Sequence, residues 1–90
     1  MPTREQIDAL AEAIDEPLLL MDGFDNAFIG TSSRINEPTL AVYSWELMVG
    51  VLMERDGMDY EDAVEYISYN CMGAWFGERT PIIVVPLEDY

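Results

Sequence analysis

The spacing of apolar residues predicts a helix near the start of the chain. Thr3, followed by a glutamine three residues later, forms the pattern of a capping box. Pro17 prevents the helix from continuing easily. We therefore expect a helix within residues 1–16, as a peripheral element. Its apolar stripe recurs at helical spacing and comprises Ile7, Leu10, Ala11 and Ile14.

A β-hairpin is predicted next. The "DG" pair at 22–23 is a strong turn signal, and we assign the turn itself to residues 24–26. Residues 27–35 have the β-branched and aromatic content of a strand. The "NEP" at 36–38 reverses the chain into a second strand, residues 39–44, so the two strands should pair antiparallel.

The second predicted helix is apolar on nearly every side. Ser44 caps it, and Gly57 stands where a left-handed residue would end it. Such a helix is either central in the fold or half of a homodimer contact. The residues that cover its circumference are Trp45, Leu47, Met48, Val49, Val51, Leu52 and Met53.

A third helix is predicted from Tyr60 to Met72. Asp59 caps it, and the acids in its early turns have a local reason to exist, because the helix dipole favours negative charge there. The inward stripe is predicted to comprise Tyr60, Ala63, Val64, Ile67 and Cys71.

Residues 69–81, "YNCMGAWFGERTP", join this helix to the last strand. We expect a glycine to end the helix, two aromatics to close over the core, a second glycine to turn the chain outward and an asparagine to bond exposed backbone. A packing role is favoured over a ligand site, since buried aromatics are primarily core material. With the turn before the hairpin, the residues given structural roles are Gly23, Phe24, Asn70, Gly73, Trp75, Phe76, Gly77 and Pro81.

The unbroken apolar run "PIIVVP" at 81–86 suits a strand that is covered on both faces. The order of elements predicts an α+β fold, with a short antiparallel sheet of about three strands packed against two or three helices. The partner of the last strand within the sheet stays open. Residues 1–90 form a single compact domain, because 90 residues with 50% hydrophobic content can bury one modest core.

Charge limits the partners. The chain has 18 acidic and 4 basic residues, for a formal charge of −14. The basic residues are arginines scattered singly, so direct binding to nucleic acid or to acidic membranes is disfavoured. The acidity either serves solubility or attracts a basic protein, such as an enzyme that binds nucleic acid. The arginines are Arg4, Arg34, Arg55 and Arg79.

Candidate chemistry is sparse. With no histidine and one cysteine, Cys71, the chain cannot form a Ser-His-Asp triad or an internal disulfide, and a zinc site is disfavoured. An EF-hand that begins at Asp22 would place Ser33 where a glutamate must close the loop. We therefore predict no enzyme activity and no cofactor. The alternative is a small metal-dependent enzyme that uses paired carboxylates, such as Asp22 with Asp25 or Asp59 with Asp62.

The N-terminal "MPTREQ" lacks a basic segment followed by an apolar run, and the apolar stretches are shorter than a bilayer span. We expect a cytoplasmic protein.

The segments "DGFDNAFIG", "LMERDGMDYEDAVEYISYN" and "GAWFGERTPIIV" resemble those of a group of small proteins encoded by tailed bacteriophages and prophages. The likeness spans about residues 20–85 and implies an accessory protein of a phage, acting in the host cytoplasm. It implies no reaction and no catalytic residue.

The preferred function is therefore non-catalytic protein–protein interaction, through the acidic surface or the apolar second helix. In a sharper form, carboxylates imitate a row of phosphates and occlude a nucleic-acid-binding groove. The residues predicted to form this surface are Glu54, Asp56, Asp59, Glu61, Asp62 and Glu65.

Overall fold

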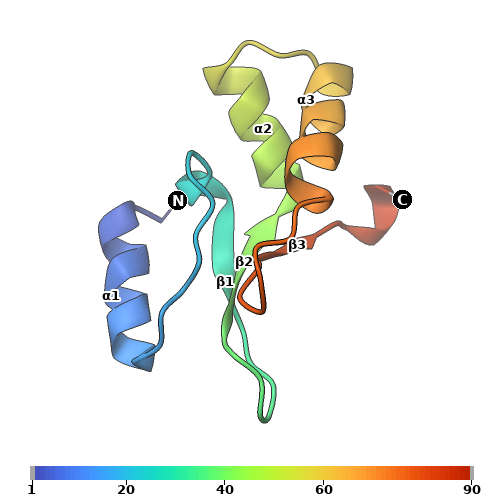
Figure 1. Cartoon of the computed structure of the whole chain (residues 1–90). Coiled ribbons are helices and arrows are strands. Elements are labelled where there is room, and N and C mark those ends of the chain that lie inside the picture. The colour runs from blue at the N-terminus through green and yellow to red at the C-terminus, as the bar shows by residue number, and fades with distance from the viewer. Residues whose placement is uncertain (1, 90) are drawn as a thin grey trace.

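The computed structural model describes residues 2–89 and confirms the α+β class. The helices are α1 (Arg4–Ile14), α2 (Trp45–Arg55) and α3 (Tyr60–Ile67), and the strands are β1 (Phe28–Ser32), β2 (Leu40–Ser44) and β3 (Ile82–Val84). Short 3-10 turns cover Asp25–Ala27 and Leu87–Asp89, and a π-helical turn, Ser68–Met72, extends α3. Figure 1 shows α1 beyond the β1 side of the sheet and the α2–α3 pair at the upper end of the strands.

The sheet has the order β1-β2-β3. The predicted antiparallel hairpin of β1 and β2 is confirmed, with a bulge between Phe28 and Gly30. The prediction that the whole sheet is antiparallel is wrong, because β3 pairs parallel to β2, with Val42 opposite Ile82. The reason is the connection: α2 and α3 together carry the chain back to the end at which β2 began, which is how parallel neighbours are joined.

All three predicted helix caps are confirmed. The Thr3 hydroxyl accepts from the amide of Gln6 at 3.2 Å, and the Gln6 side chain accepts in return from the amide of Thr3 at 2.9 Å. Ser44 accepts from the amide of Leu47 at 3.2 Å, and Asp59 from that of Asp62 at 2.8 Å. Each bond satisfies an amide that the first helical turn leaves without a partner.

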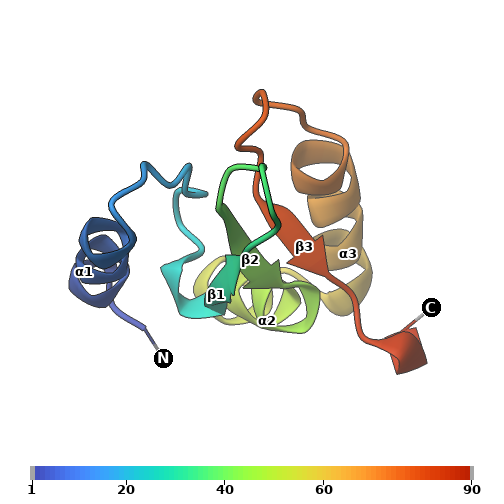
Figure 2. The same cartoon turned by 90° about the horizontal axis from the view of Figure 1, so that it is seen from below.

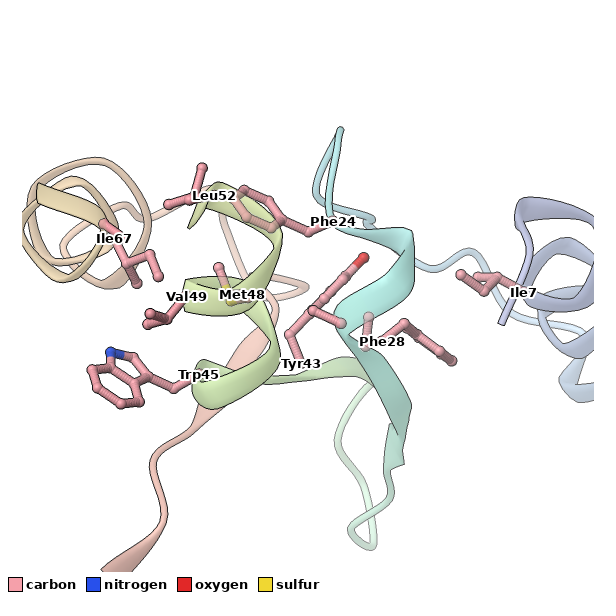
Figure 3. Close-up of a cluster of buried hydrophobic side chains, with 12 residues drawn as sticks. Ile7, Phe24, Phe28, Tyr43, Trp45, Met48, Val49, Leu52 and Ile67 are labelled. Carbon is pink, nitrogen blue, oxygen red and sulfur yellow. The ribbon is translucent and has the colours of Figure 1, made fainter. Parts of the chain in front are cut away.

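α2 occupies the central position that its composition allowed. Figure 3 shows it between the helix that carries Ile67 and the strand that carries Tyr43. Its exposed large side chains are limited to Leu47 and Met53, at 36% and 40%. The apolar α2 is therefore mostly core, which removes much of its value as a docking surface. The buried core comprises Ile7, Phe24, Ala27, Phe28, Ala41, Tyr43, Trp45, Met48, Val49, Leu52, Ala63 and Ile67.

Two burial predictions are wrong at the α3 and β3 side. Tyr60 is 52% exposed, and its ring only meets the edge of Trp45, with centroids 6.4 Å apart. β3 is not covered on both faces, since Ile82 and Val84 are 37% and 45% exposed. β3 lies at the edge of the sheet, and only the face of Ile83 packs against the core.

The helix α1 is peripheral, as expected, and stands apart from the α2–α3 pair in both views (Figures 1 and 2). Of its predicted stripe only Ile7 is fully buried, at 1% exposed. Arg4 anchors the same end of the helix through a bidentate pair with Asp25, both bonds being 3.0 Å. This pair raises the pKa of Arg4, first through the hydrogen bond and then through the charge of Asp25.

Candidate functional site

The segment that joins α3 to β3 is a compact turn with its own hydrogen bonds. Gly77 has φ +95°, a left-handed conformation that glycine adopts without strain. The Thr80 hydroxyl accepts from the amide of Phe76 and donates to the carbonyl of Gly77, both at 2.7 Å. Pro81 then precedes β3. The predicted outward turn at Gly77 is thus confirmed, and Thr80 is the residue that closes it.

The end of the preceding helix differs in detail from the prediction. Asn70 Nδ2 donates to the carbonyl of Tyr66 at 3.1 Å, inside the helical segment and not in the turn that follows. Gly73 ends the helix at φ −86°, so it does not use the left-handed conformation that was the reason for expecting glycine there. A π-helical turn widens the helix over Ser68–Met72, and such turns occur frequently at functional sites.

Trp75 and Phe76 do not close over the core, which corrects the prediction from sequence. Trp75 is 75% exposed and Phe76 is 64% exposed. Trp45 and Ile67 belong to the buried core between α2 and α3, whereas the hydrogen bonds of Thr80 close the turn of residues 76–80 on itself. The two aromatic side chains therefore stand on the surface.

A groove of about 340 Å³ lies beside these aromatics. One wall is the irregular segment 19–22, which follows α1, and the other is the end of α3 with its π-helical turn. We call it the Phe76 groove. Its lining residues are Leu19, Leu20, Met21, Asp22, Phe24, Tyr66, Asn70, Cys71, Phe76 and Pro81.

Two further hollows adjoin the Phe76 groove. One, of about 430 Å³, shares Leu19 and Phe76 with it and ends at Glu78. The other, of about 260 Å³, shares Cys71 and Pro81 with it and extends to Trp75. Phe76 thus lines the groove and the first hollow, and Trp75 lines the second.

The only cation that lines these three hollows, among residues 2–89, is Arg79. Its Nη1 donates to the carbonyl of Pro17 at 2.9 Å and lies 3.5 Å from Glu16. Glu16 in turn accepts from the hydroxyl and the amide of Thr39, at 2.7 and 3.2 Å. These two bonds from Thr39, and then Arg79, lower the pKa of Glu16. Arg79 is therefore already engaged within the chain.

Cys71 is the one thiol in the groove wall within the described residues. It is half-buried, and this burial raises the pKa of its thiol. A raised pKa keeps the thiol protonated at neutral pH, and the thiolate is the reactive form. Cys71 thus behaves as part of the apolar wall.

The turn of Gly23 and Phe24 contributes Phe24 to the groove wall and is tied to α2 by Arg55. Gly23 has φ +83°, and its carbonyl accepts from Arg55 Nη1 at 2.6 Å. The Arg55 guanidinium lies 5.8 Å from the centroid of the Phe24 ring, within the range of a cation–π contact. Phe24 is itself buried, at 5% exposed, so the structural roles predicted for both residues agree with their surroundings.

The six carboxylates predicted to form an acidic surface are all exposed, along the end of α2, the following loop and the first turns of α3. Asp56 is paired with Arg55, with bonds of 3.0 Å that lower its pKa. Asp62 lies one helical turn before Tyr66, so this surface reaches the wall of the Phe76 groove along one side of α3. The structure thus brings together two features that sequence reasoning treated separately.

Within residues 2–89, no three acidic or cysteine side chains are grouped so that they could hold a metal ion. The described helices include none with the length and apolarity needed to cross a membrane. Comparisons with protein-family models, curated proteins and solved structures found no significant match to this chain.

Proposed function

We propose that this protein is a non-catalytic accessory protein of the tailed-phage type, which acts in the host cytoplasm by binding another protein. The observation that carries the proposal is the exposure of Trp75 and Phe76 beside the Phe76 groove. Tryptophan and other aromatic residues supply much of the binding energy of protein interfaces, particularly next to pockets. Solvated aromatics of this size contribute little to the stability of the free domain.

The charge of the chain supports a basic partner. A formal charge of −14 favours encounter with positively charged proteins and disfavours nucleic acid itself. Three of the four arginines are held by internal carboxylates, namely Arg4, Arg55 and Arg79. Few cations on the surface therefore oppose this attraction.

The test is affinity capture from host lysate with wild-type protein and with the Trp75→Ala, Phe76→Ala double variant. We expect a partner that the wild-type protein retains and the variant loses. The matched control is Ile35→Ala, since Ile35 is 87% exposed in the hairpin loop, far along the chain from the groove. Circular dichroism checks that all three proteins fold. Equal retention by all three would contradict the proposal that these aromatics form the interface.

A second candidate is an acidic mimic of nucleic acid, which would occupy the phosphate-binding groove of a basic protein. It is favoured by the exposure of all six carboxylates between Glu54 and Glu65. The only arginine among them, Arg55, is engaged by Asp56 and by the carbonyl of Gly23. Because Arg55 is engaged in this way, the other five carboxylates remain available to bind a partner.

The mimic predicts binding that collapses between roughly 0.1 and 1 M salt, because exposed charges are screened at such ionic strengths. The variant Glu61→Gln, Asp62→Asn, Glu65→Gln leaves the Asp59 cap intact and should abolish capture. The control with the same charge change, on α1, is Glu5→Gln, Asp8→Asn, Glu12→Gln. Capture of the partner that persists at high salt, or an equal loss of capture for both variants, would argue against mimicry.

A further inference from the structure

We propose that the Phe76 groove is the site that receives a short, extended segment of the partner, with bulky apolar side chains flanked by lysine or arginine. This inference rests on the proposed function and specifies the chemistry of the partner. Three features of the groove carry it: its apolar walls, the charges at its ends and the free backbone along one wall.

Because the walls are apolar, we expect the central side chains of the partner segment to be apolar. The Phe76 groove and the hollow that ends at Glu78 share Leu19 and Phe76, so the two depressions meet at these side chains. Two apolar side chains of one segment, pointing the same way, would fill the two depressions. Phe76 would lie between them and lose much of its present 64% exposure.

The carboxylates at the ends of the groove favour lysine or arginine as the flanking residues of the partner segment. Asp22 lines the groove at one end, and its carboxylate is fully exposed. It lies 3.9 Å from Arg4 Nη2, which pairs more closely with Asp25, at 3.0 Å. Glu78 lines the neighbouring hollow at the other end and is also exposed. Asp62 adds a third carboxylate, one turn before Tyr66 on α3. Arg79 offers no compensating charge, since it is paired with Glu16.

The wall formed by the segment after α1 favours an extended conformation of the bound partner segment. Residues 18–20 form neither helix nor strand, and their amides and carbonyls make no hydrogen bond within the part of the chain that is described. An extended segment can pair with such backbone, as in recognition by strand addition. A helix would leave these groups unpaired against its side.

The test uses a synthetic extended peptide with two leucines in alternate positions and arginines at both ends. Two control peptides have the same length: one replaces the leucines by serine, and the other replaces the arginines by glutamate. Binding is followed by the ¹⁵N–¹H spectrum of the protein. We expect shifts at the Trp75 indole, at Phe76 and Asn70 and along residues 18–22, with the first peptide only.

Protein variants give the second arm. Phe76→Ser should weaken binding of the leucine–arginine peptide by about tenfold or more, as for a central interface aromatic. Asp22→Asn with Glu78→Gln should weaken it less and remove most of its salt dependence. Ile35→Ser should leave it unchanged. All of these side chains are on the surface, so the variants should fold.

Equal binding of the serine control peptide, or shifts confined to residues 54–65, would show attraction to the acidic surface alone and would overturn this inference. So would unchanged affinity of Phe76→Ser. These outcomes leave the proposed function standing if the Trp75→Ala, Phe76→Ala variant still loses the partner captured from lysate. Retention of the partner by that variant, in contrast, would contradict the proposed function itself.

Discussion

Arg55 Nη1 donates a hydrogen bond of 2.6 Å to the carbonyl oxygen of Gly23, 32 residues earlier in the chain. This bond ties the end of α2 to the turn before the hairpin. The same guanidinium covers the ring of Phe24, which belongs to the core. The conformation of Gly23 is therefore part of how the α2–α3 pair is held against the rest of the fold.

Replacing Gly23 by alanine should destabilise the protein by about 1–2 kcal/mol, since φ +83° is strained for any residue with a Cβ atom. The new Cβ would also lie 3.0 Å from Arg55 Nη1. The control is Gly50→Ala within α2, where a Cβ meets nothing within 4 Å. That variant should gain about 0.5–1 kcal/mol. Urea unfolding measures both, and equal effects of the same sign would contradict this account.

The hydroxyl of Tyr43 accepts from the amide of Met21 at 2.9 Å, and the side chain is fully buried. Tyr43→Phe should cost about 1 kcal/mol of unfolding free energy, because the amide of Met21 loses its acceptor in a partly buried position. Tyr69→Phe is the control, since Tyr69 is 78% exposed. If Tyr43→Phe unfolds like wild type, water replaces the hydroxyl without cost.

α1 depends on Ile7 for its attachment to the core. Ile7→Ala should destabilise the protein by about 2–4 kcal/mol, as for other large-to-small changes at fully buried sites. Ile14→Ala, at a half-buried position of the same helix, should cost about 1 kcal/mol or less. Thermal unfolding followed by circular dichroism compares the two. Equal costs would mean that α1 does not dock through Ile7.

Part of the stability of the protein should depend on pH through Glu16. Its pKa is lowered in the folded protein by the bonds from Thr39, and then by Arg79. A group with a lowered folded pKa contributes stability that is present above its ordinary pKa and is lost as pH falls through the folded value. The free energy of unfolding, measured with urea from neutral to acid pH, should therefore fall less steeply for Glu16→Gln than for wild type.

The matched control for this titration is Glu12→Gln, on an exposed side of α1. It should follow the wild-type pH dependence. Parallel curves for Glu16→Gln and wild type would contradict the role given to the carboxylate of Glu16.

Local features could be predicted from the chain because each involves residues close in sequence. The caps at Thr3, Ser44 and Asp59 each join a side chain to an amide three residues later. The all-round apolar pattern of α2 likewise indicated either a central place or a homodimer contact, since such a helix must be covered, and α2 lies in the core. The hairpin followed from two strand-like runs and the turn residues between them.

The candidate site could not be predicted in this way. The apolar content of Trp75 and Phe76 suggested core material, because most large aromatics are buried. Their exposure depends on which side chains form the core beside α3, and there Trp45 and Ile67 are buried whereas Trp75 and Phe76 are not. The Phe76 groove likewise joins segments 19–22 and 66–81, whose proximity no local pattern encodes.

By itself, the sequence determined the helices, their caps, the hairpin and the strongly negative charge, because propensity, capping and composition act over a few residues. Only the tertiary structure decided that β3 pairs parallel to β2, that Tyr60 and one face of β3 stay exposed, and that the aromatic turn faces solvent. These outcomes depend on competition for a single small core. A domain of 90 residues can bury only a modest core, so some of its apolar side chains stay exposed.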